Sequence, residues 1–222
     1  VKALVGAGAA ISLGRHANFD PGSFARTFLE VAHDQERRLR LGKVARLLVD
    51  GKGAARVVDL LTKETSSDDV GMRAATVEDV LLIWEWANDP VTRANSFHPQ
   101  PIAWTTHVEW LENRLNSPDT RFWLLEEGAV PVGLIRYDRQ GEDTAQISFM
   151  VDPDHRGKGF GTKLLALSKG DACQALGVKT LKGIAMAENL ASSRAFEKAG
   201  FESICNENVA DRECRVFIWE AC

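Results

Sequence analysis

One stretch, residues 147–162 (ISFMVDPDHRGKGFGT), restricts the possible folds of this chain more than any other. An apolar segment ends at Asp152-Pro153, and a turn with three alternating glycines leads directly into an amphipathic helix. Glycines allow positive φ angles and let an anion approach the main chain, and a helix start offers unpaired N–H groups and partial positive charge. The stretch therefore predicts a strand–turn–helix unit that cradles a diphosphate.

Two sequence patterns narrow the kind of phosphate ligand. The Walker pattern and the dinucleotide fingerprint G-x-G-x-x-G are both absent. The turn instead matches R-x-x-G-x-G, with Arg156, Gly159 and Gly161, and a second pattern, N-x-x-S-x-x-x-x-E-K-x-G-F, runs from Asn189 to Phe201. In this order and at this separation, the two patterns make residues 71–222 resemble the GNAT superfamily of acetyl-coenzyme A dependent N-acetyltransferases.

The resemblance implies where coenzyme A binds. The glycine turn would hold its diphosphate, and the helix after Asn189 would flank its thiol arm. The sheet would splay where the strand ending at Val151 stops, so that main-chain groups there pair with the pantetheine arm like an added strand. The residues assigned to the cofactor are Phe149, Met150, Val151, Arg156, Gly157, Lys158, Gly159, Phe160, Gly161, Thr162, Asn189 and Ser192.

Beyond residue 71, helical and strand periodicities alternate. Helices are expected from Thr76, at about 105–115, at 161–175 and at 190–198, and strands at 121–126, 130–137, 145–151, 180–187, 202–206 and 214–219. This order predicts an α/β (α+β) fold, a GNAT-like mixed and mostly antiparallel central sheet flanked by helices.

The polar stretch at 62–71 reads as a linker, which divides the chain into residues 1–67 and a GNAT domain at 68–222. About 60 residues with two helical patterns and at most one strand cannot close a sheet of their own. Residues 1–62, and the run at 48–61 above all, resemble the C-terminal tail of the glycosyltransferase-B-like nucleotide-sugar hydrolase of pseudaminic acid biosynthesis. We therefore expect a short, mainly helical remnant, which serves as a structural segment or a dimerisation arm.

The resemblance implies direct attack of a primary amine on the thioester through a tetrahedral intermediate. Family members often use a glutamate as the base and a tyrosine as the acid, but Phe196 stands where that tyrosine often lies. Ser193, Tyr137 or solvent would then protonate the thiolate. The base stays unassigned: Gln146 and Ser148 are not bases, and the upstream alternatives are Glu85 and His107.

The loop at 86–98 is the candidate acceptor site. Aromatic, amide, hydroxyl and guanidinium groups suit a sugar that carries phosphate. The candidates are Trp86, Asn88, Arg93, Ser96 and His98, which match a W-x-N-D-x-x-x-R-x-x-S pattern similar to that of amino-sugar nucleotide N-acetyltransferases of pseudaminic acid biosynthesis. The expected acceptor is a nucleotide-linked 4-amino sugar. A protein N-terminal or ribosomal-protein acetyltransferase, a degenerate coenzyme A binding module, and an ordinary helix-capping loop are the alternatives.

Charge and composition limit the partners. A net charge of −4 gives no footprint for nucleic acid, and the four cysteines form no C-x-x-C pair and have no histidine at ligand spacing, so no metal site is expected. The sequence shows neither an apolar run of membrane length nor a secretory signal, so a cytoplasmic location and no membrane contact are expected. The expected partner is a small-molecule amine, with a homodimer left open.

Overall fold

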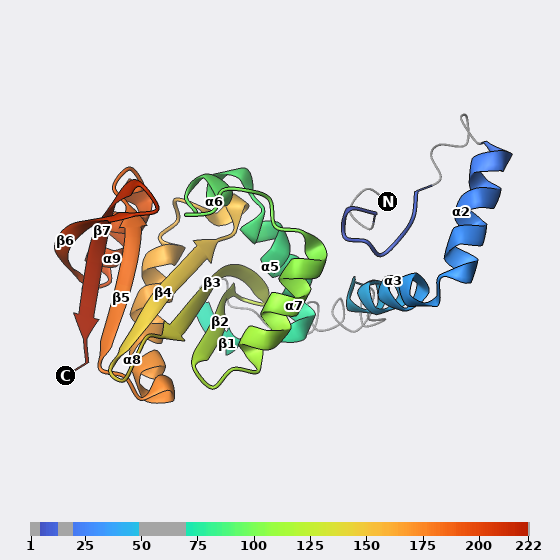
Figure 1. The fold of residues 1–222 in the computed structure, drawn as a ribbon. Helices are drawn as coiled ribbons and strands as arrows, with labels where there is room; N and C mark the ends of the chain where they lie inside the picture. The colour runs from blue at the N-terminus through green and yellow to red at the C-terminus, as the bar shows by residue number, and fades with distance from the viewer. Residues whose placement is uncertain (1–4, 13–19, 49–69, 222) are drawn as a thin grey trace.

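The computed structural model describes residues 5–12, 20–48 and 70–221, and its centre is one seven-stranded sheet (Figure 1). The strands lie in the order β1-β2-β3-β4-β5-β7-β6, and every neighbouring pair is antiparallel except β4 with β5. Their bounds are β1 Val70–Ala74, β2 Thr120–Glu127, β3 Val130–Arg139, β4 Thr144–Val151, β5 Thr180–Met186, β6 Glu202–Val209 and β7 Arg212–Glu220. The mixed, mostly antiparallel sheet that the sequence predicts is confirmed.

Helices cover the sheet from both sides. Two of them, α5 and α7, pack on one face, and α8 and α9 pack on the other (Figure 1). The helices are α2 Pro21–His33, α3 Gln35–Leu48, α5 Val80–Ala87, α6 Pro90–Ala94, α7 Trp104–Leu115, α8 Phe160–Leu176 and α9 Leu190–Lys198, with 3-10 turns η2 Val77–Asp79 and η3 Pro153–His155. Among the described residues, no helix is long and apolar enough to cross a membrane.

The parallel pair β4–β5 separates partway along its length. The two strands are in register from Thr144 opposite Thr180 to Ile147 opposite Gly183, and the pairing ends there. Beyond that point, residues 148–151 of β4 pair only with β3, and residues 184–186 of β5 pair only with β7. The sheet is therefore open between the ends of β4 and β5, as the family resemblance implies.

An aromatic side chain from α9 lies where the two strands part. A Cβ atom built on Gly183 would lie 2.3 Å from the ring of Phe196, so only glycine leaves room for that ring. Phe196 also stacks on Phe217 at 4.9 Å between centroids and meets the ring of Phe149 edge to face at 5.5 Å. Phe196 therefore contacts both β4 and β5 beside their point of separation.

Two elements differ from the sequence expectation. β1 falls partly in the stretch predicted as a linker; it is a short edge strand with little apolar pattern, defined by its pairing with β2 and by the ion pairs of Arg73 with Asp79 and Glu126. α6 lies in the segment predicted as a loop. Its start signal is Asp89 followed by proline, a helix cap and a first-turn residue.

The N-terminal elements touch the domain at few points. α2 has no buried residue, and Phe28 is 61% exposed. Ala7 and Val44 are buried in the same hydrophobic cluster as the inner residues of α5 and α7. The Lys43 ammonium of α3 lies 3.5 Å from a carboxylate oxygen of Glu112 on α7. The predicted helical character is confirmed. The boundary near residue 67 and nearly all of the run at 48–61 lie outside the described residues.

The packing of Phe196 on β5 predicts a contrast between two glycines. Gly183→Ala should destabilise the fold by about 1–3 kcal/mol, because its methyl group overlaps the Phe196 ring. Gly170→Ala, in the exposed middle of α8 with open space around it, should stabilise the fold by about 0.5–1 kcal/mol. Urea unfolding measures both, and equal stability of the two variants would contradict the packing described.

Candidate functional site

The turn between β4 and α8 has the backbone that the glycine pattern predicts. Gly157 and Gly159 adopt φ angles of +79° and +86°, in the left-handed region that other residues rarely enter. Gly159 is the N-cap of α8, and no side chain caps that helix. A Cβ built on either glycine would meet nothing within 4 Å, so the main chain of the turn faces open space. The first N–H groups of α8 are thus available to an anion.

Gly161, unlike Gly157 and Gly159, lies in a crowded place between secondary-structure elements. Its added Cβ would lie 3.1 Å from the Phe149 ring and 3.5 Å from the Cβ of Ala195. The absence of a side chain at Gly161 therefore brings the start of α8 close to β4 and α9. The glycine turn and the opening in the sheet consequently lie next to each other.

The opening offers main-chain groups to an extended ligand. Phe149, Met150 and Val151 are half-buried, and β3 occupies one edge of their strand while β5 has diverged from the other. Across the opening, Asn189 accepts a hydrogen bond from the Ser192 N–H at 3.1 Å and caps α9. An extended chain placed there could pair with β4 as an additional strand.

The remaining residues assigned to the cofactor divide into two groups. Lys158 is exposed on the turn and Thr162 is half-buried in the first turn of α8, so both lie at the surface of the cradle. Phe160 is 3% exposed and belongs to the core, where it packs edge to face with His155. Its ring anchors the turn and is not exposed to a ligand.

Arg156 points toward the acceptor loop. Its guanidinium donates to the Asp89 carboxylate and to the Thr92 hydroxyl at 3.0 Å. Asp89 also caps α6, and although burial works in the opposite direction, its hydrogen bonds with Arg156 and Thr92 hold the pKa of Asp89 below its usual value. Sequence reasoning missed this link, because nothing in the spacing of Asp89 and Arg156 indicates that they meet.

Two of the predicted acceptor residues have structural roles. Trp86 of α5 is 5% exposed and lies in the core that α5 and α7 share. Asn88 fastens the end of α5 to the segment before α7: its amide oxygen accepts from the Ile102 N–H at 2.7 Å, and its amide nitrogen donates to the carbonyls of Trp84 and Ile102. These contacts give Trp86 and Asn88 structural roles, and their assignment to the acceptor stays a prediction.

The other three predicted acceptor residues remain available. Arg93 is half-buried and donates from Nη1 to the His98 carbonyl at 3.1 Å, while its Nε is buried with no hydrogen-bond partner among the described residues. Burial lowers the pKa of Arg93, and no carboxylate of the described part forms an ion pair with it. His98 is exposed, and Ser96 accepts weakly from the His98 N–H at 3.4 Å.

The two candidate acids are both deep in the fold. Tyr137 is fully buried in the core shared with α8, its hydroxyl lies 2.7 Å from the Ser168 hydroxyl, and burial raises its pKa above the usual range. Ser193 is 1% exposed, and its hydroxyl has no partner among the described residues. Tyr137 is therefore occupied as a core hydrogen-bonding group. Phe196, in the position often held by tyrosine, is 2% exposed.

The upstream candidates for a base differ in environment. His107 of α7 is 1% exposed, and its Nε2 has no partner among the described residues. Burial lowers the pKa of His107 to about 4, so the imidazole is neutral at pH 7. Glu85 is exposed on α5, and Gln146 and Ser148 lie on β4. In the described part of the chain, no three metal-ligating side chains come together.

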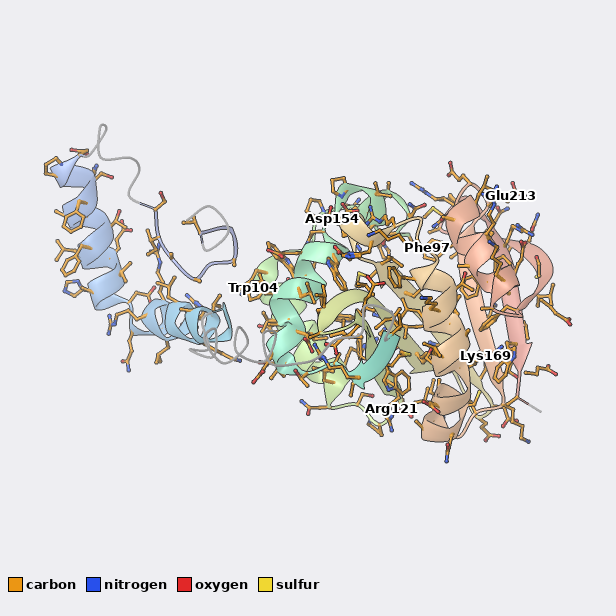
Figure 2. The ribbon with its side chains drawn as sticks, turned by 180° about the vertical axis from the view of Figure 1, so that it is seen from behind. Phe97, Trp104, Arg121, Asp154, Lys169 and Glu213 are labelled. Carbon is orange, nitrogen blue, oxygen red and sulfur yellow. The ribbon has the colours of Figure 1, made fainter. Side chains whose placement is uncertain are left out.

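Three turns gather at one end of the sheet. Figure 2 shows Asp154 of η3, Phe97 after α6 and Glu213 of β7 at the end opposite Arg121. Arg212, at the start of β7, donates to the Ala94 carbonyl at 3.4 Å and lies 3.1 Å from the Met186 sulfur. α6 is thus fixed on one side to the glycine turn and on the other to the β6–β7 hairpin.

A family comparison covers most of the domain. The sequence model described as "Acetyltransferase (GNAT) domain" matches residues 69–202. No curated protein matches the chain.

Several solved structures are similar to this chain. The aminoglycoside acetyltransferase AAC(6')-Ib, solved with ribostamycin and coenzyme A, has 19% identity and a TM-score of 0.60 over 69% of this chain and 94% of its own. The spermidine N-acetyltransferase of Vibrio cholerae, solved with CoA and spermine, has 17% identity and a TM-score of 0.60 over 68% and 95%. YncA of Salmonella typhimurium, solved with acetyl-CoA, has 23% identity and a TM-score of 0.60 over 68% and 93%. At these identities, the likeness shows the fold.

The burial of His107 predicts a pH dependence of stability. The unfolded imidazole has a pKa near 6.5 and the folded one a pKa of about 4, so between these values only the unfolded chain binds the proton. The neutral imidazole therefore imposes no cost on folding above about pH 6.5. As the pH drops to 4, the free energy of unfolding falls by about 3 kcal/mol. Unfolding free energies of His107→Leu should lack this slope, whereas His98→Gln, at an exposed histidine, should keep it. If the unfolding free energy of His107→Leu changed with pH as steeply as that of the wild type, the slope could not come from His107.

Proposed function

The chain belongs to the GNAT family of acetyltransferases, and on that premise we propose that the opening between β4 and β5 binds acetyl-coenzyme A and presents its acetyl group to a primary amine. The observation that carries this proposal is the continuity of the glycine turn with the end of the β4–β5 pairing. An anion site and an unpaired strand edge lie side by side, which is the combination that a diphosphate with an extended arm requires.

The residues present fit coenzyme A. The uncapped start of α8 and the main chain at Gly157 and Gly159 would hold the diphosphate, and the free edge of residues 149–151 would hold the pantetheine arm. When bound, the cofactor supplies a thioester whose acyl carbon is open to an amine. N–H groups of β4 at the opening would stabilise negative charge that develops on the acyl oxygen. Lys158, exposed on the turn, adds positive charge beside the phosphates.

The finer part of the proposal concerns the acceptor, a nucleotide-linked 4-amino sugar. Arg93 supports it, because this guanidinium has a buried N–H without a partner and no carboxylate in the described part neutralises it. A phosphate or carboxylate on the acceptor would accept a hydrogen bond from this N–H and neutralise the charge of the guanidinium. AAC(6')-Ib and the spermidine N-acetyltransferase were solved with amines that are cationic, so Arg93 is the feature that favours an acceptor of another kind.

A second candidate, a coenzyme A binding module without transferase activity, has two observations in its favour. Phe196 replaces the tyrosine often found in the family, and no acidic side chain lies on β4. A protein N-terminus as the acceptor is the remaining alternative. A release assay for the coenzyme A thiol, run with an amino-sugar nucleotide, spermine, kanamycin and an N-terminal peptide, separates these functions.

The cradle predicts a cofactor-binding defect that strain alone does not cause. Gly159→Asp should abolish coenzyme A binding in calorimetry, because a carboxylate then stands at the helix start where the diphosphate binds. Gly141→Asp is the matched control: Gly141 has a similar φ of +82° and equally open surroundings, but lies in the β3–β4 turn. Arg156→Glu should also weaken binding strongly. Unchanged affinity in Gly159→Asp would refute the cradle.

The buried Nε–H of Arg93, which has no partner among the described residues, predicts selectivity among acceptors. Arg93→Gln should raise the KM for an amine that bears phosphate about tenfold or more, since a hydrogen bond to a charged group is worth about 1.5–3 kcal/mol. The KM for spermine should not rise. Arg26→Gln, at an exposed arginine of α2, is the control and should behave as the wild type. Equal KM increases for both acceptors in Arg93→Gln would contradict anion recognition by Arg93.

A further inference from the structure

The proposed chemistry requires a group that takes a proton from the acceptor, and the strand pattern shows where to look. Leu181 and Ala185 of β5 and Ile147 and Phe149 of β4 lie in the core under α8 and α9. Side chains alternate along a strand, so Gln146, Ser148, Lys182 and Ile184 lie on the opposite face. We call this side, which α5 and α7 share, the acceptor face.

An ion pair lies on the acceptor face beside the opening. The Lys182 ammonium lies 3.3 and 3.4 Å from the two carboxylate oxygens of Glu207 on β6. Lys182 is opposite Gln146, one residue before the last β4–β5 pair, whereas Glu207 is opposite Cys214, which pairs with Met186 at the end of β5. Along β5, the two ends of this ion pair therefore lie on either side of Ile184, the first β5 residue that no longer pairs with β4.

The same contact shows how the β6–β7 hairpin is bent. In a flat sheet, the rows of Lys182 and Met186 would lie about 13 Å apart along the strand, too far for this ion pair. The hairpin must therefore curl across the acceptor face, which agrees with the burial of Cys214 and Val216 and with the hydrogen bond from Arg212 to α6. The ion pair therefore holds the Glu207 carboxylate on the acceptor face, next to the β5 residues where pairing with β4 ends.

Two other carboxylates near this face are engaged elsewhere. Asp89 holds Arg156, and Asp138 is buried with Thr120 and the guanidiniums of Arg114 and Arg136. By contrast, Glu207 is partnered by one flexible lysine and its side chain is 41% exposed. Cys214 lies opposite Glu207, and Arg212 and Glu213 are the other charged groups that act on this thiol; burial raises the pKa of Cys214, so it stays neutral.

We infer that Glu207, positioned by Lys182, accepts the proton of the acceptor ammonium; the inference rests on the proposed function. The carboxylate takes one proton from R–NH3⁺, and the neutral amine then forms the C–N bond to the acyl carbon as the C–S bond breaks. The nitrogen loses a second proton as the departing thiolate gains one. Glu207 releases its proton to solvent, so each turnover yields the amide, the free thiol and one H⁺.

A purely structural role for the ion pair predicts something else. An exposed ion pair contributes at most about 1 kcal/mol to stability, so its loss alone would change unfolding slightly and leave turnover intact. A proton-accepting carboxylate predicts a large kinetic loss with an unchanged fold. Glu202 provides the matched control, because it lies on the same strand and the same face, opposite Ile218, and is exposed.

The test measures kcat/KM against pH for wild type, Glu207→Gln, Glu207→Asp and Glu202→Gln, with the best amine of the four-acceptor panel and with coenzyme A affinity as the fold check. Glu207→Gln should lose about 10²–10⁴-fold in kcat/KM at pH 7 while binding coenzyme A normally. The deficit should shrink as the pH rises, since the free amine then forms without a base. Glu207→Asp should be partly active, and Glu202→Gln should match wild type.

Each outcome has one meaning. A Glu207→Gln profile that matches wild type overturns the role of Glu207 and leaves the transferase intact. An equal loss in Glu202→Gln, or a deficit that does not depend on pH, also overturns it, because either result indicates a general effect on the hairpin. Absence of thiol release by wild type with every amine overturns the proposed function, and the inference with it.

Discussion

The separation of β4 from β5 is the constraint on which the rest of the site depends. It occurs where the Phe196 ring packs against Gly183 on one strand and Phe149 on the other. A larger residue at 183 would displace the ring. Phe149 in turn lies against Gly161, so the same small group of contacts sets both the opening in the sheet and the approach of α8 to it. The residue that often is a tyrosine in the family serves here as packing.

The short helix α6 joins the parts of the site that the sequence keeps far apart. At its start, Asp89 receives Arg156 from the glycine turn, and at its end, the Ala94 carbonyl receives Arg212 from the β6–β7 hairpin. The glycine turn and the β6–β7 hairpin are therefore connected through the six residues 89–94. Because Arg156 already has a carboxylate partner, we propose that it positions the acceptor loop as well as contributing charge near the diphosphate.

The sequence was sufficient for features that local rules determine. Apolar periodicity predicted the helices and strands from 104 to 220 closely, and the glycines of the turn predicted its left-handed backbone and the open start of α8. Features that depend on tertiary contact were not predictable. Asn88 looked like a sugar ligand, but its amide serves the backbone of Ile102, and Glu207 gave no signal because only the curl of the hairpin brings it to Lys182.

The glycine turn and the free edge of β4 together are proposed to hold the acyl carrier. A crystal structure of the protein with acetyl-coenzyme A would show whether they do. We expect diphosphate oxygens within hydrogen-bond distance of main-chain N–H groups between residues 157 and 162, and an arm that runs along residues 149–151. Density for the carrier at any other surface, with the gap between β4 and β5 left vacant, would contradict this proposal.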